Sequence, residues 1–572
     1  MRTYKRYGDS TMERLYDDPY LLMDEELEAS FGAVDQFAIA LGVAGDDPRR
    51  VEAGVQFELN YNLTGGHSFL PEDKLIAATA SLLSVEEPAV RQAVERLLEV
   101  DRLNRDRLAG ITVIYLPRLY EAETESAQCL LAFAKNTFPE PRNLDKLIRS
   151  VAADSGIDYS QQQLQAIREA ATSGLLLITG GPGTGKTTIL NGILELLGRM
   201  QLRTLLAAPT GRAAKRLSEV TGEDASTIHR LLEAGIDPAT GKMFFARDGE
   251  NPLKCDAVIG DEMSMVDVQL LHSLLQAIPQ GKRLILVGDP DQLPPVGPGF
   301  PFGDMLRSGQ LPTVRLTEIF RQAQQSLIVM NAHRVNQGEM PDLKCVTSDF
   351  FFMRRNSEES VCSLIRDLCA TRLPTNMGIP ADQIQVLSPT RKGPVGTVNL
   401  NRLLQAALNP PSPEKKERAY GDYLFREGDR VMQIRNNYDI LWKKTDASMV
   451  GAVIFNGDVG IIQSIDPGAE GMSVLFDDRV AEYDFTQLNE LEPAYAMTVH
   501  KSQGSENRAV VLAARNGSPY LLSRSILYTA ITRARELLVI EGREETVGVM
   551  VENAKKNRRY SGLKLRLQGK TG

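Results

Sequence analysis

The chain has 572 residues and a formal net charge of −9, with 42% hydrophobic and 24% charged residues. This composition excludes a collagenous or low-complexity chain, and the length predicts several domains at about 100–200 residues each. The negative charge argues against a protein that coats nucleic acid through bulk positive charge, but it does not exclude a basic channel inside an acidic body.

No apolar run reaches the roughly 18 residues that a membrane-spanning helix needs. The basic start of the chain is not followed by the apolar stretch of a secretory signal. We therefore expect a cytoplasmic protein without membrane contact. The five cysteines are scattered and form no Cys-x-x-Cys pair, so neither a disulfide framework nor a structural zinc site is predicted.

Residues 1–150 form the first predicted region, in which short amphipathic helices are broken by Gly and Pro. In residues 88–100, for example, Val90, Val94 and Leu97 fall on one helical face. From about residue 175, apolar strands alternate with helical stretches, which predicts an α/β fold with helices on both faces of a parallel sheet. Ligands of such a sheet bind at the carboxyl ends of its strands.

Residues 180–187, GGPGTGKT, fit the pattern G-x-x-x-x-G-K-[ST] between a predicted strand and a predicted helix. In such a loop, backbone N–H groups surround nucleotide phosphates, Lys186 reaches the β- and γ-phosphates, and the Thr187 hydroxyl ligates Mg²⁺. The alternative is a glycine-rich turn without a ligand. The predicted nucleotide-binding residues of this loop are Gly181, Pro182, Gly183, Thr184, Gly185, Lys186, Thr187 and Thr188.

Two later strands carry polar residues at their ends. Residues 258–260 lead to Asp261, which is suited to hold the metal, and to Glu262, which is suited to orient and deprotonate the attacking water. Residues 284–287 lead to Gln292, a neutral donor suited to detecting a γ-phosphate. Together with the phosphate-binding loop, these residues predict a nucleotide hydrolase that uses Mg²⁺.

Arg321 and Arg533 lie far from the phosphate-binding loop in the sequence. A guanidinium on the γ-phosphate stabilises the transition state of phosphoanhydride hydrolysis. If both arginines come from a second sheet domain, the nucleotide occupies a cleft whose closure depends on the γ-phosphate, which predicts a motor. The alternative is that either arginine forms a surface ion pair.

Three other segments stand apart from the sheet pattern. Residues 234–252 contain a short β-prone run between turn signals, which predicts a small inserted hairpin. Residues 421–492 alternate between short apolar and polar stretches, which predicts a small antiparallel barrel. Residues 555–570 carry seven basic residues and no acid (7 − 0 = +7), which indicates either a phosphate contact or a solvated tail.

Nine segments follow one another along the chain: YSQQQLQAI, GGPGTGKTT, AAPTGRAAKRL, STIHRLL, DEMSM, GDPDQLPPVGPG, LTEIFRQ, YAMTVHKSQGSE and YTAITRARE. In this order they resemble the motif series of superfamily-1 DNA helicases. The resemblance is to the RecD-like group, in the stand-alone form that works without RecB and RecC. GAVDQFAIALGV and DDPRRVEAGV resemble its N-terminal helical region, and FREGDRVMQIRNNYD with NGDVGII resembles its SH3-like barrel.

The resemblance implies two RecA-like P-loop NTPase domains. Full-length members usually begin with an oligonucleotide-binding-like domain and tandem helix-hairpin-helix motifs, whereas this chain begins at what resembles the end of the second region. We therefore expect either a truncated or a naturally short form. The implied domains are an N-terminal helical region with a helix-hairpin-helix tail and a winged-helix-like part (1–150), motor domain 1 (151–315) with a strand-separating pin (234–252), motor domain 2 (316–420 and 493–572) and an SH3-like barrel insert (421–492).

The resemblance also implies roles by position. Gln163 would contact adenine, Phe320 would stack on it, and Glu506 would belong to the nucleotide site. Short hydroxyls, imidazoles and backbone amides suit phosphate contacts that position a strand without reading its sequence. Taken without the motifs, His229 and His500 are better explained as structural histidines. The residues that would line a single-strand track are Thr210, Arg212, Thr227, His229, Pro294, Pro295, Arg391, Thr498, His500 and Ser502.

The sequence thus predicts an ATP-dependent DNA helicase that moves 5′→3′ on single-stranded DNA and unwinds duplexes in DNA repair or recombination. Its expected partners are single-stranded DNA and single-strand/duplex junctions, with a single-strand-binding protein as a candidate, and we expect a monomer. Two alternatives stay open. One is an RNA helicase of the same superfamily, because phosphate contacts do not exclude a 2′-OH, and the other is a RecD-type ATPase subunit active only within a nuclease complex.

Overall fold

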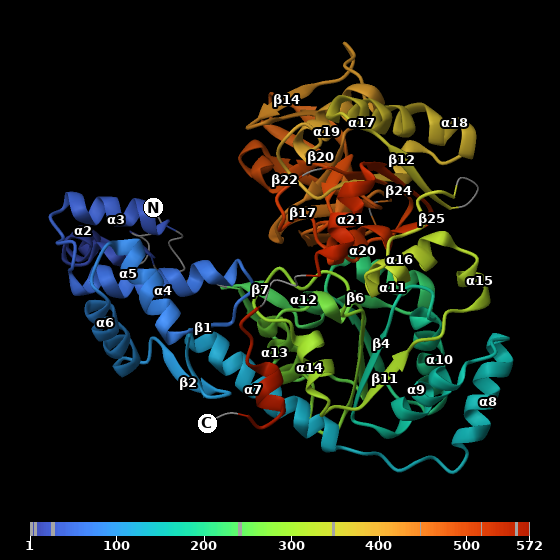
Figure 1. The fold of residues 1–572 in the computed structure, drawn as a ribbon, viewed down its shortest axis with the longest axis horizontal. Coiled ribbons are helices and arrows are strands. Elements are labelled where there is room, and N and C mark those ends of the chain that lie inside the picture. The colour runs from blue at the N-terminus through green and yellow to red at the C-terminus, as the bar shows by residue number, and fades with distance from the viewer. Residues whose placement is uncertain are drawn as a thin grey trace.

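The computed structural model describes residues 4, 8–23, 29–237, 243–345, 349–446, 448–515, 517–554 and 559–570. Figure 1 shows an N-terminal helical region beside two α/β domains, one coloured mainly green and the other yellow to red. The predicted α/β class with two parallel sheets is confirmed. In this described part of the chain, no helix has both the length and the apolar character that a bilayer span requires.

The N-terminal region packs its helices around a three-stranded antiparallel sheet of order β1-β3-β2. The helix predicted over residues 88–100 is α6, and its Val90, Val94 and Leu97 are buried in the core of this region. The elements are η1 (Gly8–Ser10), α2 (Thr11–Asp17), η2 (Pro19–Met23), α3 (Phe31–Ala40), α4 (Pro48–Leu63), β1 (Phe69–Pro71), α5 (Glu72–Leu83), α6 (Glu87–Glu99), β2 (Asn104–Leu108), β3 (Ile111–Tyr115) and α7 (Pro117–Lys135). The next helix, α8 (Leu144–Ser155), lies partly within the predicted N-terminal region, but its Leu144, Ile148 and Val151 are buried in the core of motor domain 1.

Motor domain 1 is built on a six-stranded parallel sheet of order β11-β4-β10-β9-β5-β6. In this sheet Gly288 pairs with Thr179, and Leu286 pairs with Gly260, so the strands end at one common edge. The elements are α9 (Gln161–Thr172), β4 (Leu175–Gly180), α10 (Lys186–Arg199), β5 (Thr204–Ala208), α11 (Gly211–Thr221), β6 (Ala225–Thr227), α12 (Ile228–Leu231), β9 (Ala257–Gly260), η3 (Met263–Met265), α13 (Val268–Ala277), β10 (Arg283–Gly288), α14 (Pro301–Ser308) and β11 (Thr313–Leu316).

Motor domain 2 has a five-stranded parallel sheet of order β12-β25-β24-β13-β23. Its core includes α16 and α20, which pack on each other through residues such as Ile328, Ala332 and Leu527. The elements are α15 (Arg321–Gln324), α16 (Leu327–Gln337), β12 (Phe350–Arg354), α17 (Glu358–Asp367), η4 (Leu368–Arg372), α18 (Leu373–Met377), η5 (Ala381–Gln383), β13 (Ile384–Ser388), α19 (Thr397–Leu408), β23 (Ala496–Thr498), β24 (Asn507–Ala514), α20 (Arg524–Ile531), β25 (Ala534–Gly542) and α21 (Glu544–Glu552).

The last helix, α22 (Leu563–Leu567), differs from the predicted domain division. Residues up to 572 were expected in motor domain 2, yet Leu563 and Leu567 are buried in the core of motor domain 1, together with α14 and the end of α7. The physical reason is that the two leucines complete an apolar surface of motor domain 1. The end of the chain therefore crosses from one motor domain to the other.

The barrel is a seven-stranded antiparallel sheet of order β18-β17-β21-β20-β19-β16-β22, preceded by a separate hairpin. The alternating segments RVMQIRN, DVGIIQSI, MSVLFD and VAEYDF, on which the barrel prediction rests, coincide with β16, β19, β20 and β21, whereas β17, β18 and β22 were not predicted. The elements are the hairpin β14 (Glu417–Tyr420) and β15 (Tyr423–Arg426), then β16 (Arg430–Gln433), β17 (Asn437–Lys444), β18 (Val450–Ile454), β19 (Val459–Asp466), β20 (Gly471–Phe476), β21 (Arg479–Asp484), η6 (Phe485–Glu490) and β22 (Leu491–Pro493).

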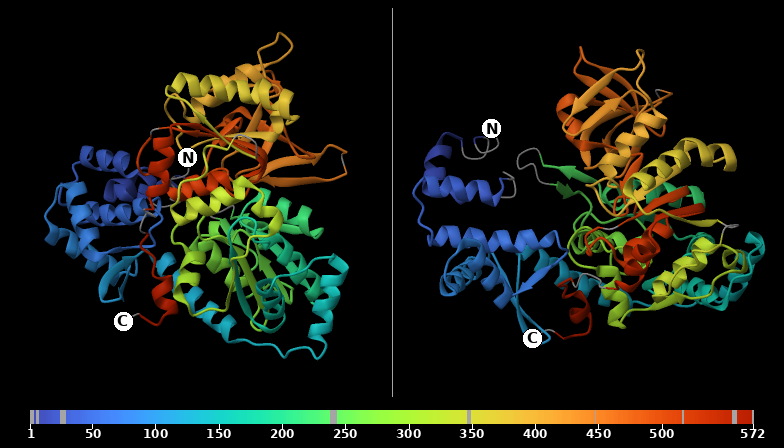
Figure 2. Two further views of the ribbon diagram at one scale, coloured as in Figure 1. Left: turned by 45° about the vertical axis from the view of Figure 1, so that its right-hand side comes forward. Right: turned by 45° about the horizontal axis from the view of Figure 1, so that its top comes forward.

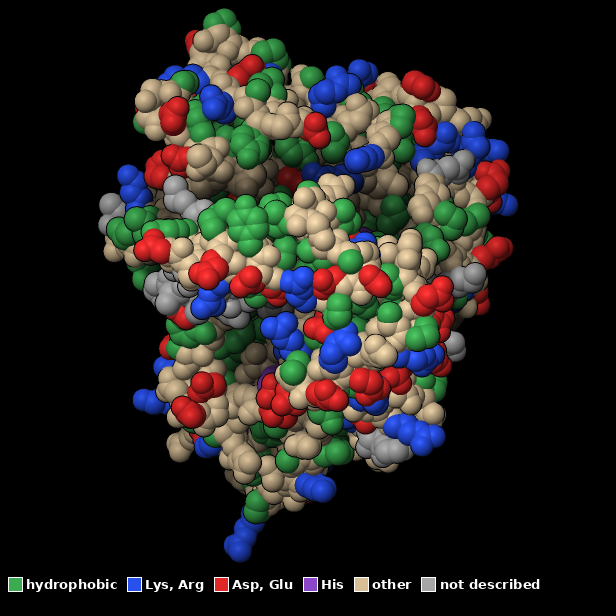
Figure 3. Space-filling view, turned by 90° about the vertical axis from the view of Figure 1, so that its left-hand side faces the viewer, with side chains coloured by type: hydrophobic (Ala, Val, Ile, Leu, Met, Phe, Trp, Pro, Cys, Tyr) green, Lys and Arg blue, Asp and Glu red, His purple; other side chains and the backbone are tan. Residues whose placement is uncertain are grey.

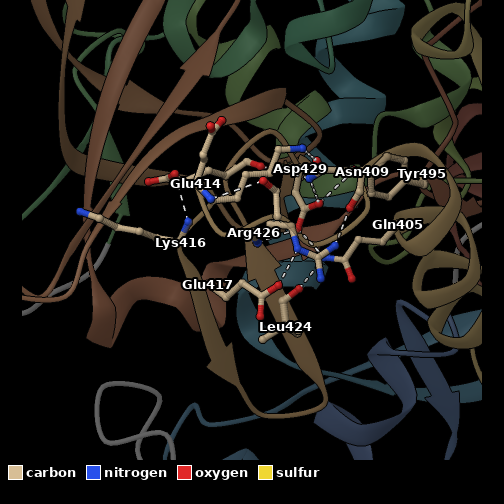
Figure 4. Close-up of polar contacts among 12 residues, drawn as sticks. Gln405, Asn409, Glu414, Lys416, Glu417, Leu424, Arg426, Asp429 and Tyr495 are labelled. Atoms are coloured by element: carbon tan, nitrogen blue, oxygen red, sulfur yellow. Dashed lines mark hydrogen bonds and ion pairs between the residues drawn. The ribbon is translucent and has the colours of Figure 1, made fainter.

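A buried carboxylate joins the barrel to motor domain 2 (Figure 4). Asp429 is fully buried and accepts hydrogen bonds from Gln405 Nε2 (2.5 Å), Asn409 Nδ2 (2.7 Å), the Arg426 backbone N–H (2.7 Å) and the Tyr495 hydroxyl (3.0 Å). These bonds compensate for the loss of hydration. Since two of the donors come from α19 and its end, the root of the barrel is fixed to motor domain 2.

The predicted hairpin insert is present as β7 (Ala234–Ile236) and β8 (Met243–Phe245), which pair antiparallel. Residues 238–242, which include the predicted Thr-Gly turn, lie outside the described part of the chain. In Figure 2 the green hairpin projects from the body of motor domain 1. Its side touches the barrel, because the Tyr438 hydroxyl lies 3.4 Å from the sulfur of Met243.

Candidate nucleotide site and single-strand track

The phosphate-binding loop connects β4 to α10 at the carboxyl edge of the first parallel sheet. Gly183 and Gly185 have φ values of 72° and 81°, in the left-handed region that favours glycine. Lys186 Nζ donates to the carbonyl oxygens of Gly180 at 2.6 Å and Gly181 at 3.1 Å. The backbone of the loop therefore surrounds the Lys186 ammonium, which lies at the start of α10.

The side chains predicted to contact the nucleotide base meet beside the loop. A Cβ placed on Gly185 would lie 2.5 Å from Gln163 Nε2 and 2.7 Å from a ring carbon of Phe320, so these side chains converge there. Gln163 Oε1 accepts from the Ser160 backbone N–H, which fixes the amide. Gln163 Nε2 is buried and has no hydrogen-bond partner among the described residues. A buried donor without a partner fits recognition of a ring nitrogen of adenine.

Two carboxylates follow β9 at the same edge. Burial and the adjacent Glu262 raise the pKa of Asp261 to about 6, while Arg216 and Lys186 act in the opposite direction. Arg216 Nη1 lies 3.8 Å from Glu262 Oε1, and Arg216 Nη2 lies 2.8 Å from Glu506 Oε1. Arg216 was not predicted, although its place one helical turn after Arg212 in the AAPTGRAAKRL segment was a usable signal.

The structure brings Gln292 and Arg533 together from the two motor domains. Arg533 Nη2 donates to Gln292 Oε1 at 3.1 Å, Nη1 to the Ser505 carbonyl at 3.1 Å and Nε to the Thr529 carbonyl at 3.2 Å. Arg533 is 2% exposed and Gln292 is 5% exposed. The interpretation of Arg533 as a surface ion-pair member is therefore wrong.

Two further contacts between the motor domains had no signal in the sequence. The Tyr528 hydroxyl of α20 donates to Asp289 Oδ2 at 2.7 Å. His333 Nε2 of α16 lies 2.9 Å from the carbonyl oxygen of Pro182, and because a carbonyl only accepts, this nitrogen carries the proton. Motor domain 2 thus contacts the phosphate-binding loop directly.

Arg321 stands at the start of α15, and its side chain lies outside the described part of the structure. Its predicted role in catalysis therefore stays a prediction. Thr187 and Thr188 lie in the first turn of α10, beside Lys186. The Mg²⁺ contact predicted for Thr187 and the nucleotide contact predicted for Thr188 also stay predictions.

A cavity of about 1270 Å³ separates motor domain 1 from the barrel. From motor domain 1 it is lined by three predicted track residues, Arg212, Thr227 and His229. Burial lowers the pKa of Arg212 to about 10, so its side chain stays cationic at neutral pH. Burial also lowers the pKa of His229, so its imidazole is neutral and offers hydrogen bonds rather than charge.

The barrel side of this cavity carries aromatic and basic residues that the motifs did not reveal. Trp442 and Phe455 are part of the wall, together with Arg479 and Lys444. The Arg479 guanidinium lies 5.6 Å from the Trp442 ring. The signal for this wall was the alternation of basic and aromatic residues in the barrel sequence, which is typical of single-strand binding.

Other predicted track residues lie near the junction of the two sheets. A Cβ on Gly504 would lie 2.7 Å from Thr210 Oγ1, so the predicted segments of the two motor domains meet there. Thr498 ends β23, and its hydroxyl accepts weakly from the Lys501 N–H at 3.4 Å. His500 is exposed close by.

Two predicted track residues already have partners within the protein. Ser502 is fully buried, and its hydroxyl donates to the Val499 carbonyl at 2.8 Å, so this side chain is not available to a DNA strand. Arg391 is exposed, and its Nη2 pairs with Glu492 at 2.9 Å and bonds the Tyr423 hydroxyl at 3.0 Å. Because Lys501 pairs with the same carboxylate at 2.5 Å, this cluster keeps a positive charge, and the DNA contact of Arg391 stays a prediction.

The basic C-terminal segment is not a solvated tail where the structure describes it. Arg566 Nη2 lies 2.7 Å from Asp106 Oδ2 in the N-terminal region. Lys555, Lys556 and Arg558 lie outside the described residues. On the face shown in Figure 3, basic and acidic side chains are interspersed, so this face carries no uniform positive field.

Four domain descriptions of known proteins match parts of the chain. The domain descriptions that match are the HHH domain of the ATP-dependent RecD2 DNA helicase at residues 1–69, an AAA domain at 163–298, the SH3 domain of the ATP-dependent RecD-like DNA helicase at 400–476 and the UvrD-like helicase C-terminal domain at 493–540.

Two curated relatives cover nearly the whole chain. The ATP-dependent RecD2 DNA helicase of Deinococcus radiodurans is 34% identical over 554 residues, which are 94% of this chain and 71% of that protein. The RecBCD enzyme subunit RecD of Mycobacterium tuberculosis is 29% identical and covers 93% of this chain and 92% of its own length. The crystal structure of Bacteroides Pif1 bound to ssDNA superposes with a TM-score of 0.40 at 18% identity, over 72% of this chain and 94% of Pif1.

Proposed function

The chain belongs to the family of ATP-dependent RecD2 DNA helicases, and from this premise we propose that it translocates 5′→3′ along single-stranded DNA to unwind duplexes in DNA repair or recombination. It is an ATP-dependent DNA helicase by its family. The observation that carries the proposed mechanism is the bond between Arg533 of motor domain 2 and Gln292 of motor domain 1. A γ-phosphate that draws both side chains closes the cleft between the domains.

In the proposed mechanism, Lys186 neutralises the β- and γ-phosphates and Glu262 orients and deprotonates the attacking water. Thr187 and Asp261 offer a hydroxyl and a carboxylate oxygen, which are the ligands that Mg²⁺ prefers. Mg²⁺ held by these two residues would neutralise negative charge on the nucleotide phosphates. Arg533 stabilises the charge that develops on the γ-phosphate oxygens, and Arg321 is proposed as its second partner.

The proposed single-strand track runs through the cavity between motor domain 1 and the barrel. Arg212 meets the phosphates, while Thr227 and His229 donate or accept hydrogen bonds, and Trp442 offers a face for base stacking. From there we propose that it continues past Pro294, Pro295, Thr498 and His500, with the β7–β8 hairpin as the pin that meets the duplex.

Trp442 is the only tryptophan of the chain, so its fluorescence reports on this cavity alone. We expect saturating oligodeoxynucleotide to change the Trp442 emission, and rising salt to reverse the change because phosphate contacts release counterions. A Trp442→Phe variant, with binding followed through labelled DNA, is the control. Binding of labelled DNA without any change in the emission would place the track elsewhere.

The polarity is tested with duplexes that carry a single-stranded tail on one end. We expect the purified chain to unwind a 5′-tailed duplex in the presence of ATP and Mg²⁺ and to leave a 3′-tailed duplex intact. Unwinding of the 3′-tailed duplex would reverse the proposed polarity. Failure on both would favour a subunit that works only inside a complex, and stronger stimulation of the ATPase by RNA than by DNA would favour an RNA substrate.

We propose a monomer in the cytoplasm that acts at single-strand/duplex junctions, with a single-strand-binding protein as a candidate partner. Sedimentation of the chain with and without a tailed duplex tests the monomer.

A further inference from the structure

The C-terminal segment leaves motor domain 2 and lies between the N-terminal region and motor domain 1 (Figure 1). We call residues 559–570 the strap. The Ser68 N–H donates to the Tyr560 carbonyl at 2.7 Å, and the Tyr560 N–H donates to His67 Nδ1 at 3.0 Å. Burial lowers the pKa of His67, aided by the positive charge of Arg559, which keeps Nδ1 free to accept.

The first residue of the strap inserts its guanidinium into the proline loop, which we define as residues 293–301. Arg559 donates to the carbonyl oxygens of Pro295 at 2.5 Å, Gly297 at 2.8 Å and Gly299 at 2.7 Å. Because proline has no N–H, a loop rich in proline has few donors of its own, and its carbonyls need donors from elsewhere. Arg559 supplies them with one rigid fork.

The Arg559 guanidinium packs closely against the backbone of Gly66 in the N-terminal region. A Cβ on Gly66 would lie 2.3 Å from Arg559 Cζ, and the Gly66 carbonyl accepts from the Gly299 N–H at 2.9 Å. Burial lowers the pKa of Arg559 to about 10, against the opposite effect of Asp267 and Asp304, so the side chain is cationic at neutral pH. The N-terminal region, the strap and the proline loop therefore meet at one charged group.

A buried carboxylate anchors the next residues of the strap. Glu123 of α7 is fully buried and accepts from the Gly562 N–H at 2.9 and 3.0 Å, from the Tyr115 hydroxyl at 2.7 Å and from the Ser561 hydroxyl at 3.1 Å. The Ser561 hydroxyl also lies 2.6 Å from Asp304 Oδ2 on α14. The strap is thus fixed to both the N-terminal region and motor domain 1.

We propose that the strap holds the proline loop at the Pro295, Gly297 and Gly299 carbonyls so that the half-buried Pro294 contacts single-stranded DNA, with Arg559 as the positioning residue. The near end of the loop follows motor domain 2 through Gln292 and Arg533. When the contact between Gln292 and Arg533 changes, the start of the proline loop moves with motor domain 2. The part of the loop that Arg559 holds stays in place, so the loop bends between them. This inference rests on the proposed function, because it takes the proline loop as part of the DNA track.

The test compares Arg559→Met, which keeps most of the volume without the donors, with Arg559→Lys in the full-length chain. We measure the oligodeoxynucleotide concentration at half-maximal ATPase stimulation and the kcat at saturating DNA. For Arg559→Met we expect this concentration to rise about tenfold, as for a typical coupling between sites, with kcat within about twofold of wild type. Arg559→Lys retains part of the hydrogen-bond donors, so its half-maximal DNA concentration is expected to lie between those of wild type and Arg559→Met. Arg535→Met is the control, since Arg535 is exposed and pairs only at 3.3 Å with Glu536.

A second variant tests the anchor without touching the proline loop. Glu123→Gln weakens the hold on Gly562 and should raise the same DNA concentration in the same direction. A wild-type DNA dependence in Arg559→Met would overturn the proposal. So would a parallel fall of kcat, DNA affinity and melting temperature in both Arg559 variants, because that marks a purely structural role. Loss of unwinding of tailed duplexes by the wild-type chain itself would instead remove the proposed function.

Discussion

Lys186→Ala is expected to lower the DNA-stimulated ATPase rate at least about 100-fold, the loss typical when one preorganised donor to a developing charge is removed. Lys186 lies in the curl of the phosphate-binding loop, where no other described cation takes its place in the hydrogen bonds to Gly180 and Gly181. Unwinding should disappear with the ATPase. Binding of single-stranded DNA, followed through Trp442 emission, should stay close to wild type because the cavity lies away from this loop.

The matched control is Lys282→Ala. Lys282 pairs with Asp256 at 2.9 Å at the opposite edge of the same sheet. A partly exposed pair of this kind contributes roughly 0–1 kcal/mol to stability, so activity should be retained. A Lys186→Ala protein that still unwinds a tailed duplex would contradict the assignment of the nucleotide site.

Arg533→Lys is expected to lower kcat for ATP by about 1000-fold, within the range found for arginines that contact a transferred phosphoryl group. The positive charge remains, but a lysine ammonium cannot bond Gln292, Ser505 and Thr529 at once. Because the site is buried, the loss of the fork also leaves acceptors without donors. We therefore expect the melting temperature to fall as well, by less than in Arg533→Ala.

Arg535→Lys provides the comparison two residues later, on β25, which begins directly after Arg533. Its side chain is exposed, and its removal from the Glu536 pair should leave kcat unchanged. Measuring nucleotide affinity separately from kcat distinguishes the roles of Arg533. An unchanged kcat in Arg533→Lys, with a properly folded protein, would show that this arginine only ties the motor domains together.

Much of the fold follows from local patterns in the sequence. The buried parallel strands are continuous apolar runs, and the turn that begins α10 has a fixed glycine spacing, so both could be predicted from short segments. The antiparallel barrel was also visible, but β17 and β18 were missed because Leu441, Met449 and Val450 are apolar residues at exposed positions, so the sequence there does not alternate between apolar and polar residues.

The candidate site was predicted only in part, because local motifs place a residue on an element without giving its partner. Gln292 and Arg533 were both expected at the nucleotide, yet their mutual hydrogen bond spans 241 positions and depends on how the domains pack. Ser502 shows the opposite error, since a hydroxyl in a tight turn bonds the nearest carbonyl before any ligand. The path of the strap could not be predicted from the sequence. Its basic composition does not indicate which acidic residue each side chain contacts in the folded protein.

The hydrogen bonds that Asp429 accepts have a mechanical consequence for the grip on DNA. They fix the barrel, which forms one wall of the cavity, to α19 of motor domain 2. The opposite wall of the cavity belongs to motor domain 1. The two walls of the cavity therefore belong to different motor domains, because the barrel is attached to the second. We expect a rotation that closes the nucleotide cleft to change the width of this cavity. In the proposed mechanism, such a rotation would couple the nucleotide state to the affinity for single-stranded DNA.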